Sequence, residues 1–191
     1  MKYCIFGGTF DPPHTGHGYL AQCACDSLHF DKLFWVPSSV PPLKNIPQTP
    51  FQHRLEMVKR VIAGNRQFEV SDIEDRLSQP SYSLNTIRAL KQELGPNHDW
   101  HFLIGADNWT LFPTWHQPES ILKEVTLVVF PRKDHPIGPL PEKTLKLPMP
   151  EMQIESRMLR EVLANSKDVN AAGIPEEIRE YILINHLYGI D

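Results

Sequence analysis

The sequence predicts an α/β fold of the doubly wound type, with a mostly parallel sheet, helices on both faces and a helical segment near the C-terminus. Short apolar runs that end at glycine or proline alternate with longer segments whose apolar residues have helical spacing. Such alternation implies right-handed helical crossovers between parallel strands. The length of 191 residues, 41% of them hydrophobic and 22% charged, suits one domain and is cramped for two.

The first half of the chain is expected to hold three strands and three helices. The first apolar run ends at Gly7-Gly8, which is typical of a buried strand followed by a tight turn. Ser83 stands where a helix cap is expected, and Gly95 stops that helix. In order, the predicted elements are a strand at 3–6, a helix at 16–28, a strand at 32–36, a helix at 52–63, a strand at 68–73 and a helix at 83–94.

The second half is expected to complete the sheet and add the helical segment. One strand ends at Gly105 and the next at Pro131, while Pro175 suits the first turn of the last helix. Prolines crowd residues 37–50 and 131–150, which predicts two long loops. The predicted elements are strands at 101–104, 125–130 and 145–147, a helix start near Pro118, and helices at 156–163 and 175–185.

Charge and composition limit the partners and the location. Lys plus Arg number 19 against 23 Asp plus Glu, a net charge of −4, so no general cationic surface is available for nucleic acid or anionic membranes. The first residues lack the features of a signal peptide, and we expect a cytoplasmic protein. The three cysteines, Cys4, Cys23 and Cys25, are read as reduced packing residues. Homo-oligomer formation is left open.

Ligands of doubly wound sheets bind outside the carboxyl ends of the strands. The loops expected to bind a ligand are therefore residues 7–17, 105–115 and 131–133. The first of these has the sequence GGTFDPPHTGH and matches neither common glycine-rich phosphate motif. Its two glycines and the helix start behind it still make a suitable anion site, because free N–H groups there carry partial positive charge.

His14 and His17 are the reactive side chains of this loop. Three residues apart on an early helical turn, they project to the same side and could donate hydrogen bonds to phosphate oxygens. Neither has to act as a base. Two other interpretations stay open: solvated or packing histidines behind a simple turn, and a metal site with Asp11 as a third ligand. The metal site is disfavoured, and no metal ligand is assigned.

The loop also resembles the signature of the nicotinate-mononucleotide adenylyltransferases, a family of the HxGH nucleotidyltransferase superfamily. The resemblance continues in order along nearly the whole chain, through residues 41–44, 53–57, 81–86, 102–107, 112–115, 181–182 and 187–188. It implies a Rossmann-like sheet and a single nucleotidyltransferase domain over residues 1–191. It also implies an enzyme that condenses nicotinate mononucleotide with ATP, using Mg²⁺, to give deamido-NAD and pyrophosphate in NAD biosynthesis.

The resemblance assigns site residues by position. The implied catalytic residues are His14, His17, Lys44 and Arg160, and the implied ATP-binding residues are Gly8, Thr9, Phe10, His14, His17, Gly105, Asp107, Ser156, Arg157 and Arg160. The histidine, lysine and arginine side chains in this set suit adenylyl transfer. A phosphomonoester acceptor is already largely ionised near neutral pH, so the protein has to supply positioning and charge stabilisation rather than a nucleophile.

The late phosphate motif departs from the family pattern. The superfamily pattern I-S-S-T-x-[hydrophobic]-R corresponds to residues 154–160, where Ser156 and Arg160 match, Glu155 replaces a hydroxyl and Arg157 replaces the threonine. Ser156 is expected to cap a helix whose N–H groups face a phosphate. Arg157 is expected to share phosphate recognition with Arg160, and Glu155 is read as a solvated side chain.

The resemblance also assigns the acceptor side of the site. It implies Thr86, Trp115 and His116 as nicotinate-mononucleotide-binding residues, with the Trp115 ring against the pyridine and His116 standing where tyrosine is commoner. Trp109 is read as a core residue. Asp107 is placed near the nucleotide, with capping of the next helix as its structural alternative.

Three other functions remain to be separated from this one. They are adenylyl transfer to pantetheine phosphate, nucleotide binding by a catalytically weakened protein, and metal-dependent hydrolysis. The intact first loop argues against loss of catalysis.

Overall fold

The computed structural model describes residues 1–42, 47–151 and 155–190. Within them, six strands form one parallel sheet in the order β3-β2-β1-β4-β5-β6. The strands are β1 (Lys2–Gly8), β2 (Lys32–Pro37), β3 (Phe68–Val70), β4 (Asp99–Gly105), β5 (Thr126–Phe130) and β6 (Thr144–Lys146). This is the doubly wound, Rossmann-like order, and the predicted fold class is confirmed.

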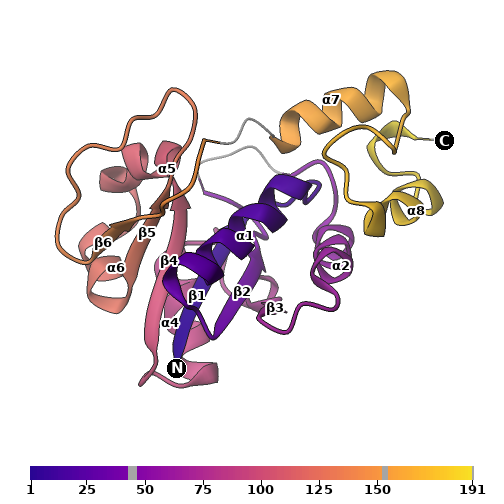
Figure 1. The fold of residues 1–191 in the computed structure, drawn as a ribbon. Coiled ribbons are helices and arrows are strands. Elements are labelled where there is room, and N and C mark those ends of the chain that lie inside the picture. The colour runs from indigo at the N-terminus through magenta and orange to yellow at the C-terminus, as the bar shows by residue number, and fades with distance from the viewer. Residues whose placement is uncertain (43–46, 152–154, 191) are drawn as a thin grey trace.

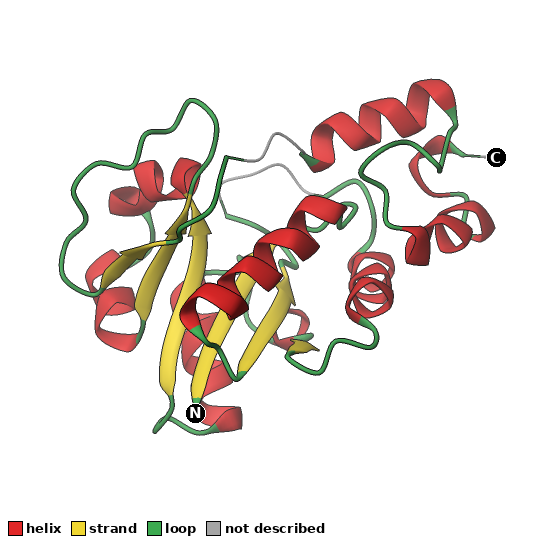
Figure 2. Cartoon of the chain, in the orientation of Figure 1, coloured by secondary structure: helices red, strands yellow, loops and turns green. Residues whose placement is uncertain are grey.

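Helices follow the strands on both faces of the sheet (Figures 1 and 2). They are α1 (Thr15–Leu28), α2 (Phe51–Ile62), α3 (Ile73–Arg76), α4 (Ser83–Leu94), α5 (Ala106–Leu111), α6 (Pro118–Glu124), α7 (Ser156–Ser166) and α8 (Glu176–Ile184), with short 3-10 turns η1 (Phe112–Thr114) and η2 (Leu187–Gly189). No helix in the described part of the chain is long and apolar enough to cross a membrane.

Two hydrophobic cores lie on opposite faces of the sheet. Successive side chains of a strand point to opposite faces. Cys4 and Phe6 of β1 therefore join the core beneath α1 and α2, whereas Ile5 joins the core beneath α4. Burial of both faces explains why the central strands are continuous apolar runs. The cysteines are free, with Cys4 and Cys25 buried, as expected for reduced packing residues.

The strand order reverses between β1 and β4, which are neighbours at the centre of the sheet. Chain crossovers leave these two strands in opposite directions, so a crevice opens at their carboxyl ends. The loops after β1 and β4 both begin there.

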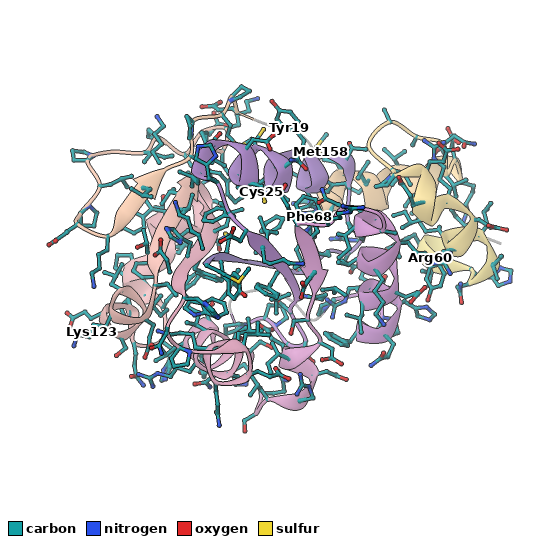
Figure 3. All side chains as sticks on the ribbon, turned by 60° about the horizontal axis from the view of Figure 1, so that its bottom comes forward. Tyr19, Cys25, Arg60, Phe68, Lys123 and Met158 are labelled. Atoms are coloured by element: carbon teal, nitrogen blue, oxygen red, sulfur yellow. The ribbon has the colours of Figure 1, made fainter. Side chains whose placement is uncertain are left out.

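The C-terminal segment forms a third cluster on the outer side of α2. Its apolar residues, from α7, α8 and η2, pack around Met57 of α2. Arg60 of α2, labelled in Figure 3, lies over the Tyr181 ring of α8, with 4.7 Å between the guanidinium carbon and the ring centroid. In Figure 1 this segment, coloured yellow, lies beside α2 and away from β5 and β6.

Several predicted boundaries are wrong in detail. The strand predicted at 68–73 ends at Val70, and Ile73 begins α3. Ser83 is the first residue of α4 rather than its cap, and Tyr82 at the cap position makes no side-chain cap bond. Pro175 occupies the N-cap position of α8, one residue before its first turn, and makes no side-chain cap bond. The helix start near Pro118 is confirmed.

Candidate active site

A cleft of about 1480 Å³ lies at the carboxyl ends of the central strands. Its walls come from the loops after β1, β4 and β5, as expected, and also from the start of α4 and the start of α7. Pockets for one drug-sized ligand usually measure about 300 to 1,000 Å³. The cleft therefore has room for two nucleotide-sized molecules side by side.

The backbone of the loop after β1 folds closely over a buried ring. Phe10 is 1% exposed, has a φ of 50° and packs edge-on against Phe6 and His17. A Cβ on Gly8 would lie 2.8 Å from the Phe10 ring, closer than real contacts allow. Glycine at position 8 thus lets the ring tuck under the loop, and Phe10 contributes its backbone position rather than its ring.

Buried polar groups hold this loop from behind. The Arg54 side chain, 1% exposed, donates a hydrogen bond from Nη1 to the carbonyl oxygen of Thr9 at 2.7 Å. The Asp11 carboxylate is 2% exposed and accepts from the backbone N–H of Gln48 at 3.1 Å and from the Tyr188 hydroxyl at 2.9 Å. Because both charged side chains are buried and hydrogen-bonded, the loop is fixed before any ligand arrives.

His14 and His17 form a reciprocal cap at the start of α1. The Nδ1 atom of His14 accepts from the backbone N–H of His17 at 3.2 Å, and Nδ1 of His17 accepts from the backbone N–H of His14 at 3.1 Å. The two rings stack with their centroids 3.5 Å apart. A neutral imidazole that accepts at Nδ1 carries its proton on Nε2. Both rings are therefore set as Nε2–H donors.

Burial, together with the nearby charge of Arg132, lowers the pKa of His14 to about 3. The ring consequently stays neutral throughout the physiological pH range. A neutral ring whose Nδ1 is occupied by the cap has no free lone pair to act as a base, so a donor role remains. The same occupancy of Nδ1, together with the hydrogen-bonded carboxylate of Asp11, argues against the alternative of a His-His-Asp metal site.

The start of α7 contacts the same loop from the other side. Ser156 donates from Oγ to the carbonyl oxygen of Pro12 at 2.9 Å, and Arg160 donates from Nη1 to the carbonyl oxygen of Asp11 at 2.6 Å. The predicted capping role of Ser156 is wrong, since Glu155 occupies the cap position and makes no side-chain cap bond. The Ser156 hydroxyl instead fastens α7 to the loop.

Two further residues of the late motif, Glu155 and Arg157, line the cleft. The Arg157 side chain is 80% exposed and pairs with Glu161 one turn along α7 at 3.1 Å. Glu155 is exposed, as expected for a solvated carboxylate.

Aromatic rings line the opposite end of the cleft. Trp115 is half-buried and packs against Phe102 and Phe112, and its indole Nε1 is buried without a hydrogen-bond partner. His116 is exposed and stacks on Tyr82 with ring centroids 4.4 Å apart. These rings offer a flat apolar surface and an unused donor.

Trp109 packs against the core and stacks on Phe112, which agrees with its predicted core role.

Asp107 and Arg132 form an ion pair in the cleft, on the loops that follow β4 and β5. A Cβ at Gly105 would collide with the Asp107 carboxylate, so the glycine lets that carboxylate fold back over the strand end. Asp107 Oδ1 and Arg132 Nε are 3.8 Å apart, too far for a hydrogen bond, and both are buried without one. Asp107 does not cap α5, whose cap residue is Gly105, so that alternative is wrong.

Arg132 lies in a loop that the sequence predicts to bind ligands, but no role was expected for this residue. The available signal was a basic pair directly after the apolar run of β5, at the sheet edge where ligands bind.

The chain is similar to known proteins over nearly its whole length. Residues 5–167 match the model of the cytidylyltransferase-like family. A protein of Exiguobacterium sibiricum named "Probable nicotinate-nucleotide adenylyltransferase" is 35% identical over 189 residues, which cover 98% of this chain and 99% of that protein. The chain belongs to the nicotinate-nucleotide adenylyltransferase family. A Bacteroides thetaiotaomicron protein of the same name is 36% identical over 188 residues and 95% of this chain.

Solved structures share the architecture. The nicotinic acid mononucleotide adenylyltransferase of Plasmodium falciparum complexed with NaAD matches with a TM-score of 0.83 at 22% identity, over 100% of this chain and 98% of that chain. At this sequence identity, the similarity shows that the two proteins share a fold.

Most residues expected from the family resemblance line one cleft. They are Gly8, Thr9, Phe10, His14, His17, Thr86, Gly105, Asp107, Trp115, His116, Ser156, Arg157 and Arg160. Lys44 lies outside the described residues. The contributions of Arg54 and Tyr188 were not expected, because their partners are distant in sequence.

Proposed function

We propose that this chain transfers AMP from ATP to nicotinate mononucleotide, giving deamido-NAD and pyrophosphate in NAD biosynthesis. The observation that carries the proposal is the pair of histidines whose Nε2–H groups are set as donors at the amino end of α1. They lie in a cleft large enough for two nucleotides. Relatives named for this activity over nearly the whole chain support it.

In the proposed reaction, an oxygen of the acceptor phosphate attacks the α-phosphorus of ATP. A new P–O bond forms as the bond between the α-phosphorus and its bridging oxygen breaks, and pyrophosphate leaves with the bonding electrons. His14 and His17 donate hydrogen bonds to phosphate oxygens and stabilise the negative charge that develops. Arg160 and Arg132, which both line the cleft, add positive charge.

Mg²⁺ is proposed to enter with ATP. No group of three or more His, Cys, Asp and Glu side chains in the described part of the chain is placed to hold a metal ion. That suits Mg²⁺, which is commonly bound by substrate phosphates with one or two carboxylates. Asp107 fits this role, because its Oδ1 is buried without a hydrogen-bond partner. When bound, the ion neutralises charge on the triphosphate.

The acceptor is proposed to occupy the aromatic end of the cleft. Trp115 offers its ring face to the pyridine, Thr86 and His116 complete this subsite, and backbone N–H groups near Trp115 favour a carboxylate. The proposal includes action as a single domain over residues 1–191, a cytoplasmic location and no nucleic-acid or membrane partner.

The assay that tests this function is pyrophosphate release from ATP and Mg²⁺ with each candidate acceptor. We expect kcat/KM for nicotinate mononucleotide to exceed that for nicotinamide mononucleotide by several orders of magnitude, because two or three donors facing an amide leave buried groups unpaired at ~1 to 3 kcal/mol each. Turnover with pantetheine phosphate alone would assign the other adenylyl transfer. ATP binding without turnover would indicate a weakened protein, and phosphate release without any acceptor a hydrolase.

Arg157→Thr, which restores the residue of the family pattern, is expected to have a small effect. Because the side chain is 80% exposed, a contact from it to a phosphate is expected to contribute only ~0.2 to 1 kcal/mol, which predicts a rise of about two- to fivefold in the KM for ATP. Steady-state kinetics at saturating acceptor measure this, with ³¹P shifts of bound ATP as a second probe. An unchanged KM and unchanged shifts would remove Arg157 from the phosphate site.

A further inference from the structure

Tyr188, on the turn η2, has an unusual backbone conformation. Its φ of 58° and ψ of 28° lie in the left-handed region, which is unfavourable for a bulky residue. Such conformations persist where the surrounding structure holds them, and they are concentrated at functional sites. The contacts of the Tyr188 side chain show what this conformation makes possible.

The turn directs the Tyr188 hydroxyl to the loop after β1. The hydroxyl donates to Oδ1 of Asp11 at 2.9 Å and lies 4.0 Å from Sδ of Met57 on α2. Burial, together with the charge of Asp11, raises the pKa of Tyr188 well above its usual value, so the hydroxyl stays protonated and remains a donor. Asp11 lines the cleft, whereas Tyr188 packs behind it with the C-terminal cluster. Tyr188 thus reaches the cleft through Asp11.

Asp11 joins the loop after β1 to three other parts of the chain, of which η2 is one. Its second carboxylate oxygen, Oδ2, accepts from the backbone N–H groups of Gln48 and Thr49, at 3.1 and 3.4 Å, in the segment that leads into α2. Its carbonyl oxygen accepts from Nη1 of Arg160 on α7 at 2.6 Å. Gln48 and Arg160 both line the cleft. The orientation of one buried residue therefore sets the position of two groups that face a ligand.

Removal of the Tyr188 hydroxyl would disturb this junction. Asp11 is 2% exposed, and Tyr188 is the hydrogen-bond partner of its Oδ1 in the described part of the chain. A buried carboxylate oxygen without a partner is unfavourable. The carboxylate would then turn toward another donor or admit water, and the backbone of Asp11 would move with it. The carbonyl oxygen that holds Arg160 would move as well.

We propose that Tyr188 is a positioning residue for adenylyl transfer, which fixes the Asp11 carboxylate and through it the placement of Arg160. The inference rests on the proposed function, in which Arg160 adds positive charge at the phosphates of ATP. The contribution of Tyr188 is to hold that charged donor in place before ATP binds. The loss of order on removal of the hydroxyl is expected at the phosphates rather than at the acceptor ring.

Tyr188→Phe tests the proposal, because it keeps the ring and removes only the donor. We expect kcat/KM for ATP to fall about tenfold, since even a small displacement of a positioning group slows a reaction of this kind. The KM for nicotinate mononucleotide should change by less than about twofold. Pyrophosphate release measured against ATP concentration at saturating acceptor gives these values, and circular dichroism checks the fold.

Tyr181→Phe is the matched control for a merely structural effect. Tyr181 lies on α8 of the same C-terminal segment, and its hydroxyl is hydrogen-bonded to Nδ1 of His53 on α2 at 2.8 Å, outside the lining of the cleft. Both variants lose one hydroxyl that ties this segment to the rest of the fold, so their melting temperatures should fall by similar amounts. Only Tyr188→Phe should lose activity. Equal kinetic losses in the two variants would overturn the proposal, as would wild-type kinetics in Tyr188→Phe.

A double-mutant cycle shows whether Tyr188 acts through Arg160. In an Arg160→Met background, the effect of Tyr188→Phe on kcat/KM for ATP should shrink to about twofold or less, because the group that it positions is gone. In an Arg88→Met background the tenfold effect should persist, since Arg88 pairs with Glu124 on the surface. A full effect in both backgrounds would contradict the proposal.

Asp11→Glu provides a second test that leaves Tyr188 intact. The longer side chain keeps the charge, but it cannot meet both the Tyr188 hydroxyl and the N–H of Gln48 without a shift of the loop backbone. We expect kcat/KM for ATP to fall at least tenfold, with the KM for the acceptor again nearly unchanged. Wild-type kinetics in Asp11→Glu would contradict the proposal even if Tyr188→Phe failed to fold.

The two hypotheses fail in different ways. A wild-type enzyme that adenylylates no acceptor would overturn the proposed function. An active wild type whose kinetics are insensitive to Tyr188→Phe would overturn only the role of Tyr188.

Discussion

His14→Asn is expected to lower kcat by about 10²- to 10³-fold, the usual effect of removing one donor to a charged transition state. Asparagine is a good helix cap, so it can still accept from the backbone N–H of His17 and keep α1 folded. It has no group that replaces the Nε2–H of the imidazole. Because charge on the departing pyrophosphate grows only in the transition state, the KM for the acceptor should change little.

Steady-state kinetics with circular dichroism and thermal melts check this expectation. His17→Ala should show a loss of the same order. His29→Asn at the other end of α1 is the matched control, since His29 has a φ of 54°, which asparagine tolerates, and it lies outside the cleft. Wild-type turnover in both His14→Asn and His17→Ala would show that this loop is not the phosphate site.

Arg160→Met is expected to lower kcat/KM for ATP by about 10²-fold. The substitution keeps an unbranched apolar stem but removes a charged donor, and charged hydrogen bonds are worth ~1.5 to 3 kcal/mol. It also removes the bond from Nη1 to the carbonyl oxygen of Asp11, which helps to hold the loop after β1.

Arg160→Lys should recover part of the loss, because it keeps the charge without the forked geometry. Arg88→Met is the matched control. Arg88 pairs with Glu124 on the surface, away from the cleft, and activity should stay within about twofold. A value for Arg160→Met within threefold of the wild type would exclude Arg160 from ATP recognition.

The strand framework was predictable because its signals are local. The apolar runs before Gly8 and Gly105 are bounded by residues that end strands, and the order of the elements then places both loops at one edge of the sheet. The family recognised from the sequence is confirmed by the relatives. The roles assigned to individual site residues stay predictions.

Helix starts were predicted less well, because tertiary partners compete for capping side chains. Serine is a residue type that often caps helices, yet the Ser156 hydroxyl donates to the carbonyl oxygen of Pro12, 144 residues away in the sequence. Helix α3 is only four residues long and shows no periodicity, so it was not foreseeable from the sequence. Arg54 lies within residues 53–57, a segment that resembles the family, but no spacing rule indicates that its side chain donates to the carbonyl oxygen of Thr9.

The bond between Asp11 and Tyr188 joins residues 177 positions apart. At synthesis rates of about 5 to 20 residues per second, roughly 10 to 35 s separate their appearance on the ribosome. During that time α1 and the first strands can form, but the Asp11 carboxylate lacks its hydroxyl partner. A nascent or prematurely released chain therefore contains the loop after β1 but lacks the finished nucleotide cleft. The cleft is complete only when η2, which carries Tyr188, has formed.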